Sequence, residues 1–417
     1  MPAAKAVRIF ISAGEASGDY YGSLLIEALR ERFPAAEFTG CGGERMRAAG
    51  CRTIVDANQL AMVGILEVAP GLARALRALK TLAESARARR PEIAVLIDFP
   101  DFNLRLARRL KRLGTPVVYF VAPQVWAWRR GRLKILRRYV DRLLCIFPFE
   151  EKFFRAAGVG AEFVGHPLVN RAAPKLDAAE FRARYGLGEA DVVGLLPGSR
   201  HKEILLNLPP MLKAAEMIQA RCSKPVRFVL PAASTISASW LRGQLGSSPP
   251  VAVVEGATYD ALAWSTCAIV ASGTASTEAA LLGTPMAIVY RVSPASWHLA
   301  RWLVDVPFFS MVNIVAGRAL VKEFIQDDFQ PEKVAEEILS LLHDASARER
   351  CRAELREVAA RLRGGASLKD AAGGATAPTN VGQEECDAIQ RSVAIIESIL
   401  SGEAAPAGSR VLAVSPP

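Results

Sequence analysis

The sequence lacks the signatures of several large classes of protein. None of its seven cysteines forms a C-x-x-C pair and no secretory signal precedes the first predicted strand, so we expect reduced cysteines in a cytosolic protein. No apolar run approaches the roughly 20 residues that a membrane span requires. RNP, KH and zinc-finger patterns are also missing, so no motif supports the binding of nucleic acid.

The composition predicts two domains and an anionic partner. The chain has 417 residues, of which 51% are hydrophobic, and this is enough for two domains with cores of their own. Its net charge of +10 favours a partner that is a nucleic acid, a nucleotide or an anionic membrane surface.

The most informative stretch runs from residue 269 to 290. Apolar runs predict two buried strands, Cys267–Ala271 and Met286–Tyr290. Between them, the turn Ser272-Gly273-Thr274 leads into a predicted helix over Ala275–Leu282. A helix that starts just beyond a strand offers unpaired amide N–H groups, and Gly273 allows a ligand to approach the backbone closely. We therefore expect this turn to bind an anion.

Glu278 is the unusual residue of this helix, because it places a carboxylate in the predicted first turn, where an anion would otherwise sit. A capping box would require Ser or Thr three residues earlier, and that residue is Ala275. Two interpretations stay open. Glu278 stabilises the helix dipole, or it accepts both hydroxyls of a ribose while the amide N–H groups face a pyrophosphate.

The chain opens with a strand, a glycine loop and a helix, as nucleotide-binding α/β folds do. The loop Gly14-Glu15-Ala16-Ser17-Gly18-Asp19 stands between a strand at Val7–Ser12 and a helix from about Tyr20 to Arg32. The loop is not G-x-G-x-x-G, and no acidic residue closes the second strand, which argues against a dinucleotide site. A sugar contact and a plain tight turn remain as alternatives.

Two carboxylates follow the buried strand Ile93–Ile97, at the edge where open α/β sheets bind ligands. Asp101 is explained as the N-cap of a helix over Phe102–Leu113. Asp98 has no such explanation, and the two residues do not have the D-x-D spacing of a metal-chelating site. We predict Asp98 as a general base, with structural hydrogen bonding as the alternative, and His166 as a second acid–base candidate.

The second half of the chain repeats the pattern of strand, glycine loop and helix at Pro197-Gly198-Ser199-Arg200. Positive charge at a helix start is unfavourable unless an anion lies nearby. Arg200 is therefore predicted to bind a diphosphate through its planar guanidinium, with a solvated loop charge as the alternative. Asn313 is predicted to contact a nucleobase or phosphate.

Apolar and aromatic side chains stand beside basic ones in three further places. The stretch over residues 60–82 and the patch over residues 296–309 suit either a protein core or a membrane interface, and the segment after the strand at Pro116–Val121 suits either helix packing or an acceptor pocket. The side chains concerned are Met62, Val63, Gln124, Trp126, Trp297 and Trp302.

These motifs, in this order, resemble the lipid-A-disaccharide synthase family of GT-B glycosyltransferases. The resemblance covers about residues 7 to 350 and also rests on four shorter motifs. These are Met62-Val63-Gly64, Val125-Trp126-Ala127-Trp128-Arg129, Gly165-His166-Pro167 and Ala316-Gly317-Arg318.

The resemblance implies an α/β fold of GT-B type, with two Rossmann-like domains that face a cleft. We expect an acceptor- and membrane-facing domain over residues 1–170 and a UDP-sugar-binding domain over 171–362. Residues 363–383 form a flexible insertion that departs from the family, 384–402 a C-terminal helix that crosses back to the first domain, and 403–417 a disordered tail. The family also allows a homodimer, because relatives can exchange the C-terminal region between subunits.

The implied activity is that of a hexosyltransferase of lipid A (lipopolysaccharide) biosynthesis. It moves 2,3-diacylglucosamine from UDP to 2,3-diacylglucosamine 1-phosphate and forms a β-1,6-linked disaccharide phosphate and UDP. Asp98 would take the proton from the acceptor 6-hydroxyl in one inverting displacement, with Glu15 and His166 next in line. Arg200 would stabilise the leaving UDP without metal or cofactor. The UDP contacts would be Gly198, Ser199, Arg200, Ser272, Gly273, Thr274, Glu278 and Asn313.

Both implied substrates carry acyl chains, which gives the apolar patches and the positive charge a purpose. We expect a cytoplasmic enzyme that attaches peripherally to anionic lipids of the inner membrane, with no nucleic-acid partner. Two alternatives stay open. One is another UDP-sugar enzyme of this fold, such as a UDP-N-acetylglucosamine epimerase or a single-sugar transferase. The other is a nucleotide-binding or peripheral membrane protein without catalysis.

Overall fold

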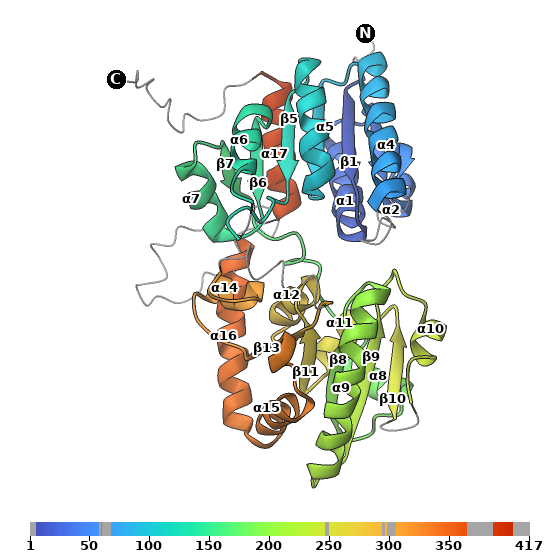
Figure 1. The fold of residues 1–417 in the computed structure, drawn as a ribbon, viewed down its shortest axis with the longest axis vertical. Helices are drawn as coiled ribbons and strands as arrows, with labels where there is room; N and C mark the ends of the chain where they lie inside the picture. The colour runs from blue at the N-terminus through green and yellow to red at the C-terminus, as the bar shows by residue number, and fades with distance from the viewer. Residues whose placement is uncertain are drawn as a thin grey trace. The chain divides into compact units, whose positions relative to one another are not determined.

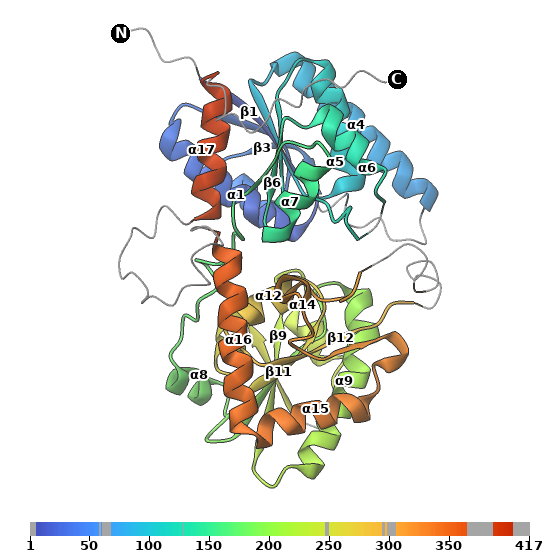
Figure 2. The same ribbon diagram turned by 90° about the vertical axis from the view of Figure 1, so that its left-hand side faces the viewer.

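The computed structural model describes residues 6–57, 60, 68–127, 129–246, 250–293, 297, 306–364 and 387–402. It contains two compact units (Figures 1 and 2). The first comprises the described residues up to Pro167 and those from Arg363 onward, and the second comprises Leu168–Leu362. The predicted insertion and tail lie outside the described residues, apart from residues 363 and 364.

A parallel sheet forms the centre of the first unit. Its described strands follow the order β3-β2-β1-β4-β5-β6-β7, and each neighbouring pair is parallel. Nearly continuous apolar runs explain these strands, because a sheet covered by helices on both faces buries every side chain. The strands are β1 Arg8–Ala13, β2 Glu37–Gly42, β3 Arg52–Asp56, β4 Ile93–Ile97, β5 Val117–Phe120, β6 Arg142–Cys145 and β7 Ala161–Phe163.

Helices cover both faces of this sheet. Figure 2 shows α1 and α17 on one side, and α4 and α5 on the other. The C-terminal helix α17 packs against α1, and Arg391 of α17 donates a hydrogen bond to the carbonyl oxygen of Val164, 3.1 Å away, just after β7. The helices are α1 Ala16–Arg32, α2 Glu44–Ala48, α4 Val68–Arg89, α5 Pro100–Arg112, α6 Arg132–Tyr139, α7 Pro148–Ala156 and α17 Ala388–Leu400.

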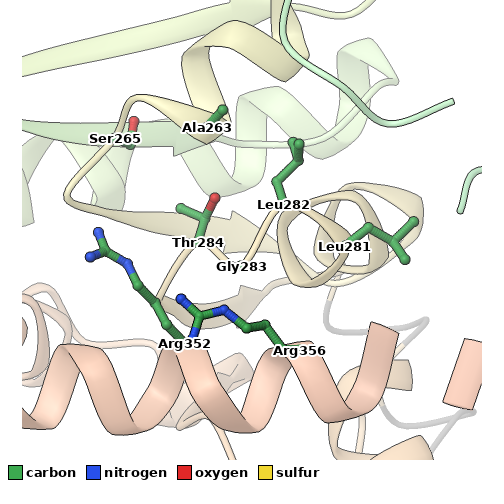
Figure 3. Close-up of a pocket in the computed structure, with 8 residues that line it drawn as sticks. All are labelled: Ala263, Ser265, Leu281, Leu282, Gly283, Thr284, Arg352 and Arg356. Carbon is green, nitrogen blue, oxygen red and sulfur yellow. The ribbon is translucent and has the colours of Figure 1, made fainter. Parts of the chain in front are cut away.

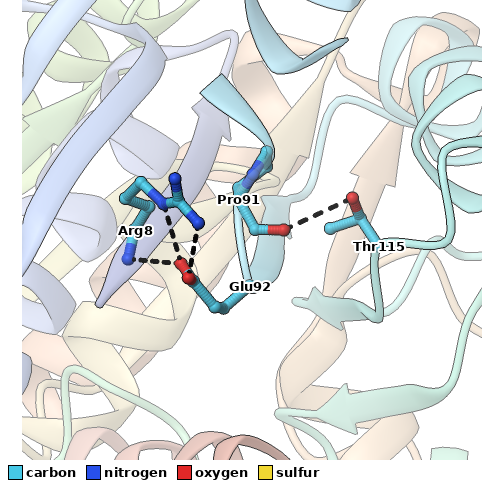
Figure 4. A network of polar contacts seen from close by, with 4 residues as sticks. All are labelled: Arg8, Pro91, Glu92 and Thr115. Atoms are coloured by element: carbon cyan, nitrogen blue, oxygen red, sulfur yellow. Dashed lines mark hydrogen bonds and ion pairs between the residues drawn. The ribbon is translucent and has the colours of Figure 1, made fainter. Parts of the chain in front are cut away.

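An ion pair joins the amino ends of two central strands of the first unit. The guanidinium of Arg8 lies 2.7 Å from Glu92 Oε1, and the Arg8 backbone N–H donates to Oε2 of the same carboxylate (Figure 4). These bonds hold the pKa of Glu92 below its usual range. The pair fixes the start of β1 beside the start of β4. These amino ends lie opposite the carboxyl ends of the strands, from which the predicted site loops extend.

The second unit is built on another parallel sheet, with the described strands in the order β10-β9-β8-β11-β12-β13. The strands are β8 Asp191–Leu196, β9 Val226–Ala232, β10 Val251–Glu255, β11 Cys267–Ala271, β12 Met286–Tyr290 and β13 Glu323–Ile325. The helices are α8 Ala178–Arg184, α9 His201–Arg221, α10 Ala238–Arg242, α11 Thr258–Ala263, α12 Thr274–Leu281, α14 Met311–Ala316, the 3-10 turn η1 Gln326–Asp328, α15 Pro331–His343 and α16 Ala345–Arg363.

Both sheets reverse their strand order at one point. In the first unit the reversal lies between β1 and β4, and in the second between β8 and β11. Open α/β sheets bind ligands at the carboxyl ends of the strands that flank such a point. The predicted fold class, two Rossmann-like parallel-sheet domains of GT-B type, is confirmed. Across the described part of the chain, no helix is both long and apolar enough to cross a membrane.

Candidate functional site

The two predicted site loops of the first unit touch at its strand-order reversal. Gly14 follows β1 and Asp98 follows β4. A Cβ atom on Gly14 would lie only 2.2 Å from Cδ1 of Phe99, so a side chain at this position would displace the phenyl ring. Glycine is therefore required at residue 14 for the close approach of the two loops.

The backbone at the end of β4 is strained. Asp98 and Phe99 have φ angles of 44° and 52°, a region that costs a non-glycine residue roughly 1–3 kcal/mol. Two hydrogen bonds hold this conformation: the hydroxyl of Tyr119 donates to the carbonyl oxygen of Asp98 at 2.6 Å, and Nδ2 of Asn103 donates to it at 2.9 Å. The backbone of Asp98 thus has a structural role, while its half-buried side chain stands at the ligand-binding edge of the sheet.

Asn103 ties the ends of β1 and β4 together. Its side chain is 0% exposed, its Nδ2 donates to the carbonyl oxygen of Ile97 at 3.0 Å, and its Oδ1 accepts from Ser12 Oγ at 2.9 Å. The sequence analysis assigned neither Asn103 nor Ser12 to the site. Asn103 lies only five residues after Asp98 in the sequence, and that proximity was the available signal.

The predicted N-cap role of Asp101 is wrong. Helix α5 begins at Pro100 and its N-cap is Phe99, because proline suits the first helical position. Asp101 therefore lies in the first turn, where its carboxylate pairs with the guanidinium of Arg129 at 2.7 Å and with that of Arg132.

The first glycine loop also differs from its prediction. Helix α1 begins at Ala16 instead of about Tyr20, so Glu15 is the N-cap residue and is half-buried. Asp19 is buried, and its carboxylate accepts the backbone N–H groups of Gly43 at 2.6 Å, of Arg45 and of Met46. Asp19 thereby caps α2, and Glu15 is the other carboxylate of this loop.

His166 lies in a core environment. Its side chain is 4% exposed and packs on the ring of Phe147 at a centroid distance of 5.6 Å. Burial lowers the pKa of His166 to about 3, so its imidazole is neutral at pH 7 and a weak base. This environment favours Asp98 over His166 as the proton acceptor.

Trp126 is held in place by a residue that the sequence analysis missed. Its indole Nε1 donates to Oε1 of Glu150 at 3.2 Å, and its ring meets that of Phe149 edge-on at 5.1 Å. Glu150 is 0% exposed, and burial raises its pKa to about 8, with the charge of Asp98 acting in the same direction. In the neighbouring sequence, the only indication of a structural role for Glu150 is its place as the third residue of α7, where glutamate often caps the start of a helix.

Of the remaining acceptor and lipid candidates, Gln124 is exposed and Trp297 half-buried. Met62, Val63 and Trp302 lie outside the described residues. The hydrogen bond to Glu150 thus ties Trp126 to the segment that follows β6, two strands along the sheet from the strand that ends before Asp98.

In the second unit, Glu203 shapes the loop that follows β8. Gly198 has a φ of 125°, and a Cβ atom there would lie 2.8 Å from Oε2 of Glu203. The same carboxylate accepts the N–H of Ser199 at 3.3 Å and pairs with the guanidinium of Arg200 at 3.0 Å. Arg200 is the N-cap residue of α9 and its side chain is 62% exposed, so the cation stands at the ligand-binding edge of this sheet.

The turn after β11 supplies the second half of this site. Gly273 has a φ of 148° and is the N-cap of α12, which begins at Thr274. The prediction that Glu278 lies in the first turn is wrong, because this earlier start places Glu278 in the second turn. Glu278 is half-buried, burial raises its pKa, and the hydroxyl of Tyr259 donates to it at 3.4 Å. Ser272 is the first residue of this turn, and its Oγ donates a hydrogen bond to the carbonyl oxygen of Phe309 at 3.4 Å.

Asn313 has a different role from its prediction in this structure. It is 0% exposed, its Nδ2 donates to Val321 and Glu323, and its Oδ1 accepts from the backbone N–H groups of Leu320 and Val321. A carboxamide has two donors and two acceptor sites, and all are used within the protein. Asn313 therefore holds the segment that begins at Phe309, which contacts Ser272, instead of presenting its amide to a ligand.

A cavity of about 400 Å³ lies elsewhere in the second unit (Figure 3). It is found at the C-terminal end of α12, whereas the site turn lies at the N-terminal end of that helix. Figure 3 shows Arg352 and Arg356 of α16 pointing toward Gly283 and Thr284. Within the residues that the structure describes, no group of three or more His, Cys, Asp or Glu side chains has a metal-binding arrangement.

Residues 9–373 match the model of the lipid-A-disaccharide synthetase family. The chain belongs to this family. The lipid-A-disaccharide synthase of Solibacter usitatus is 48% identical over 358 residues, which cover 86% of this chain and 93% of that protein. That of Koribacter versatilis is 46% identical over 370 residues, covering 88% and 96%. The predicted resemblance, and with it membership of a glycosyltransferase family, is confirmed.

Solved structures share the fold at low identity. The calicheamicin glycosyltransferase has a TM-score of 0.55 at 16% identity, with coverage of 97% of this chain and 100% of that one. The UDP-N-acetylglucosamine 2-epimerase from Neisseria meningitidis, solved with UDP-N-acetylglucosamine bound, has a TM-score of 0.56 at 10% identity, with coverage of 95% and 100%. Because transferases and epimerases both appear, this likeness establishes the fold alone, and the family match separates the synthase from the epimerase alternative.

Proposed function

We propose that the chain catalyses the reaction for which its family is named, the formation of the lipid A disaccharide. The donor is UDP-2,3-diacylglucosamine and the acceptor 2,3-diacylglucosamine 1-phosphate. The observation that carries this proposal is the position of four candidate residues. Glu15 and Asp98 follow the two strands where the first sheet reverses its order, and Arg200 and Gly273 follow the two strands where the second sheet does so.

Asp98 is the proposed general base of the transfer. A single inverting displacement requires one group that removes the proton from the acceptor 6-hydroxyl, and a positioned base contributes about 10²- to 10⁴-fold. The hydrogen bonds from Tyr119 and Asn103 fix the backbone from which the Asp98 side chain projects. Such fixed geometry is what proton transfer in a transition state demands.

The second unit is proposed to bind the UDP part of the donor. Arg200 offers a guanidinium fork to the diphosphate, and the amide N–H groups at the start of α9 and α12 face the same edge of the sheet. Glu278 would accept the ribose hydroxyls and Ser199 and Thr274, both exposed, would add hydroxyl contacts. The negative charge that develops on the leaving UDP would be stabilised by these groups.

We also propose peripheral attachment to anionic lipid through the first unit. On α4, Leu72 and Leu76 are 48% and 44% exposed one helical turn apart, and Arg77 and Lys80 are exposed beside them. An amphipathic helix with exposed leucines and basic side chains suits a membrane interface. Flotation with vesicles that contain phosphatidylglycerol tests this, and absence of binding would remove the attachment from the proposal. The homodimer that the family allows stays a prediction, which light scattering would check.

The proposed reaction is tested by UDP release in detergent, in the presence of EDTA, with and without the acylated acceptor phosphate. We expect release that requires the acceptor and is insensitive to EDTA. Release without acceptor would instead favour a hydrolase or epimerase-like enzyme. UDP binding without any release would leave a nucleotide-binding protein.

A further inference from the structure

A buried carboxyl group follows β6, two strands along the sheet from the proposed base that follows β4, and the reaction as described does not use it. Glu150 of α7 is completely buried. Its Oε1 accepts the indole Nε1–H of Trp126 at 3.2 Å, and its Oε2 accepts the backbone N–H of Phe147 at 3.3 Å. A carboxyl group is costly to bury, so its retention at this place calls for an explanation.

The rings around Glu150 form a continuous chain. Trp126 meets Phe149 at a centroid distance of 5.1 Å, Phe149 stacks on Phe147 at 6.1 Å, and Phe147 packs on His166 at 5.6 Å. These contacts join the segments that follow β5, β6 and β7. Glu150 contacts two members of this chain, Trp126 and Phe147, so it fixes their relative position.

The titratable groups near Glu150 influence whether its carboxyl group is protonated while it contacts Trp126 and Phe147. Asp98, at the end of β4, is the nearby carboxylate whose charge opposes ionisation of Glu150. Cys145 of β6 is buried, and the pKa of its thiol is raised well above its usual value by burial and by Glu150, so the thiol stays neutral. His166, whose ring packs on that of Phe147, is neutral as well. Among these three neighbours, Asp98 is therefore the one whose charge raises the pKa of Glu150.

We propose that Glu150 is a positioning residue of the acceptor site: its Oε1 accepts the indole Nε1–H of Trp126 and holds this ring at the carboxyl end of the sheet, where the acceptor hydroxyl meets Asp98. This inference rests on the proposed transferase function and assigns Trp126 to acceptor binding. Ionisation of Glu150 would place a second negative charge near Asp98 and disturb the base and Trp126 together.

The first test is spectroscopic and does not depend on activity. Tryptophan emission is titrated from pH 6 to about 9.5 in the wild type, in Trp126→Phe and in Glu150→Gln. We expect a transition near pH 8 in the wild type that both variants lack, because burial raises the pKa of Glu150 to about 8. A transition that persists in Glu150→Gln would overturn the assignment to Glu150.

The second test is kinetic. Glu150→Ala is expected to raise the acceptor KM about tenfold while the donor KM stays within about twofold, because a lost positioning contact affects one substrate. Trp126→Phe should give a similar increase, and the double variant should not exceed the larger single effect, as coupled residues show. Glu150→Gln, which keeps an acceptor for the indole N–H, should lie closer to the wild type at pH 7.

The matched control is Glu151→Ala, one residue further along α7, where the carboxylate pairs with Arg155 at 2.8 Å. It should change neither KM. Equal changes in donor and acceptor KM in a folded Glu150→Ala protein, or no change in either, would overturn the positioning role. If the wild type shows the emission transition but transfers no sugar, the proposed function fails while the coupling of Glu150 to Trp126 stands.

Discussion

The two sheets share one strand order, yet their reversal points carry different chemistry. In the first unit the edge is rigid and partly buried: Asp98 and Phe99 have positive φ, and Asn103 joins the two strand ends from inside the core. In the second unit the edge is open, with Gly273 at the start of a helix and Arg200 exposed. The topology thus provides one reversal point in each unit, and under the proposed function the local side chains determine whether it supplies a base or binds an anion.

Proton transfer is proposed for the first unit, and the substitution with the largest expected effect on kcat tests this. Asp98→Asn should lower kcat by about 10³-fold or more, because loss of a general base costs this much, while UDP affinity is retained. Asp101→Asn is the matched control, since its exposed carboxylate pairs with Arg129 and Arg132, and it should stay within about threefold of the wild type. Near-normal transfer by Asp98→Asn would contradict the assignment, and Glu15 would be tested next.

The rigidity of the first edge is tested through Asn103. Asn103→Ala removes buried hydrogen bonds to Ser12, Ile97 and Asp98, so the free energy of unfolding should fall by about 3 kcal/mol. Asn170, which is exposed, provides the control Asn170→Ala, with an expected change within about 0.5 kcal/mol. Urea unfolding measures both. Equal stability of the two variants would show that the buried hydrogen bonds of Asn103 do not contribute to the free energy of unfolding.

The open edge of the second unit is tested through its cation. Arg200→Ala should weaken UDP binding about 30-fold, since charge-assisted hydrogen bonds to phosphate contribute roughly 2 kcal/mol. Arg242→Ala removes another exposed guanidinium of this unit, one that pairs with Glu255 at 2.8 Å, and should leave UDP affinity unchanged. Calorimetric titration with UDP compares them, and equal affinities would mean that Arg200 is a solvated charge.

The last prediction concerns the pH dependence of stability. Burial raises the pKa of Glu150 from 4.5 to about 8, so between these values the folded state binds more protons than the unfolded state. Stability should therefore decrease with rising pH in this window, by up to roughly 1.4 kcal/mol per pH unit from this group. Glu150→Gln should lack this contribution. Urea titrations at pH 5 and pH 8 measure the difference, and identical pH dependence in both proteins would contradict it.

Strands were the most predictable part of the fold. The bounds of Ile93–Ile97, Cys267–Ala271 and Met286–Tyr290 agree with the sequence prediction. Each is a continuous apolar run with polar residues or proline on either side, and such a run has one obvious place in a parallel sheet. Helix starts were less predictable, because glycine and proline residues that read as loop belong to the first turns of α1 and α5.

The side chains that organise the site could not be predicted from local patterns. Asn103 contacts Ser12, 91 residues earlier in the chain, and Glu150 contacts Trp126, 24 residues earlier. Nothing in the neighbouring residues indicates such partners, because only the folded sheet brings them together. Asp98 and Arg200 were accessible to prediction for the opposite reason. Asp98 directly follows a strand and Arg200 stands in the short loop after another, and the carboxyl end of a strand at the reversal of a parallel sheet is a ligand-binding position.

The most direct test of the division between the two edges measures UDP binding and acceptor-dependent transfer in the same preparations of wild type, Asp98→Asn and Arg200→Ala. The two edges have separate roles if Asp98→Asn binds UDP like the wild type but transfers no sugar, while Arg200→Ala loses UDP affinity. Equal loss of both properties in the two variants, or full transfer by Asp98→Asn, would contradict that division.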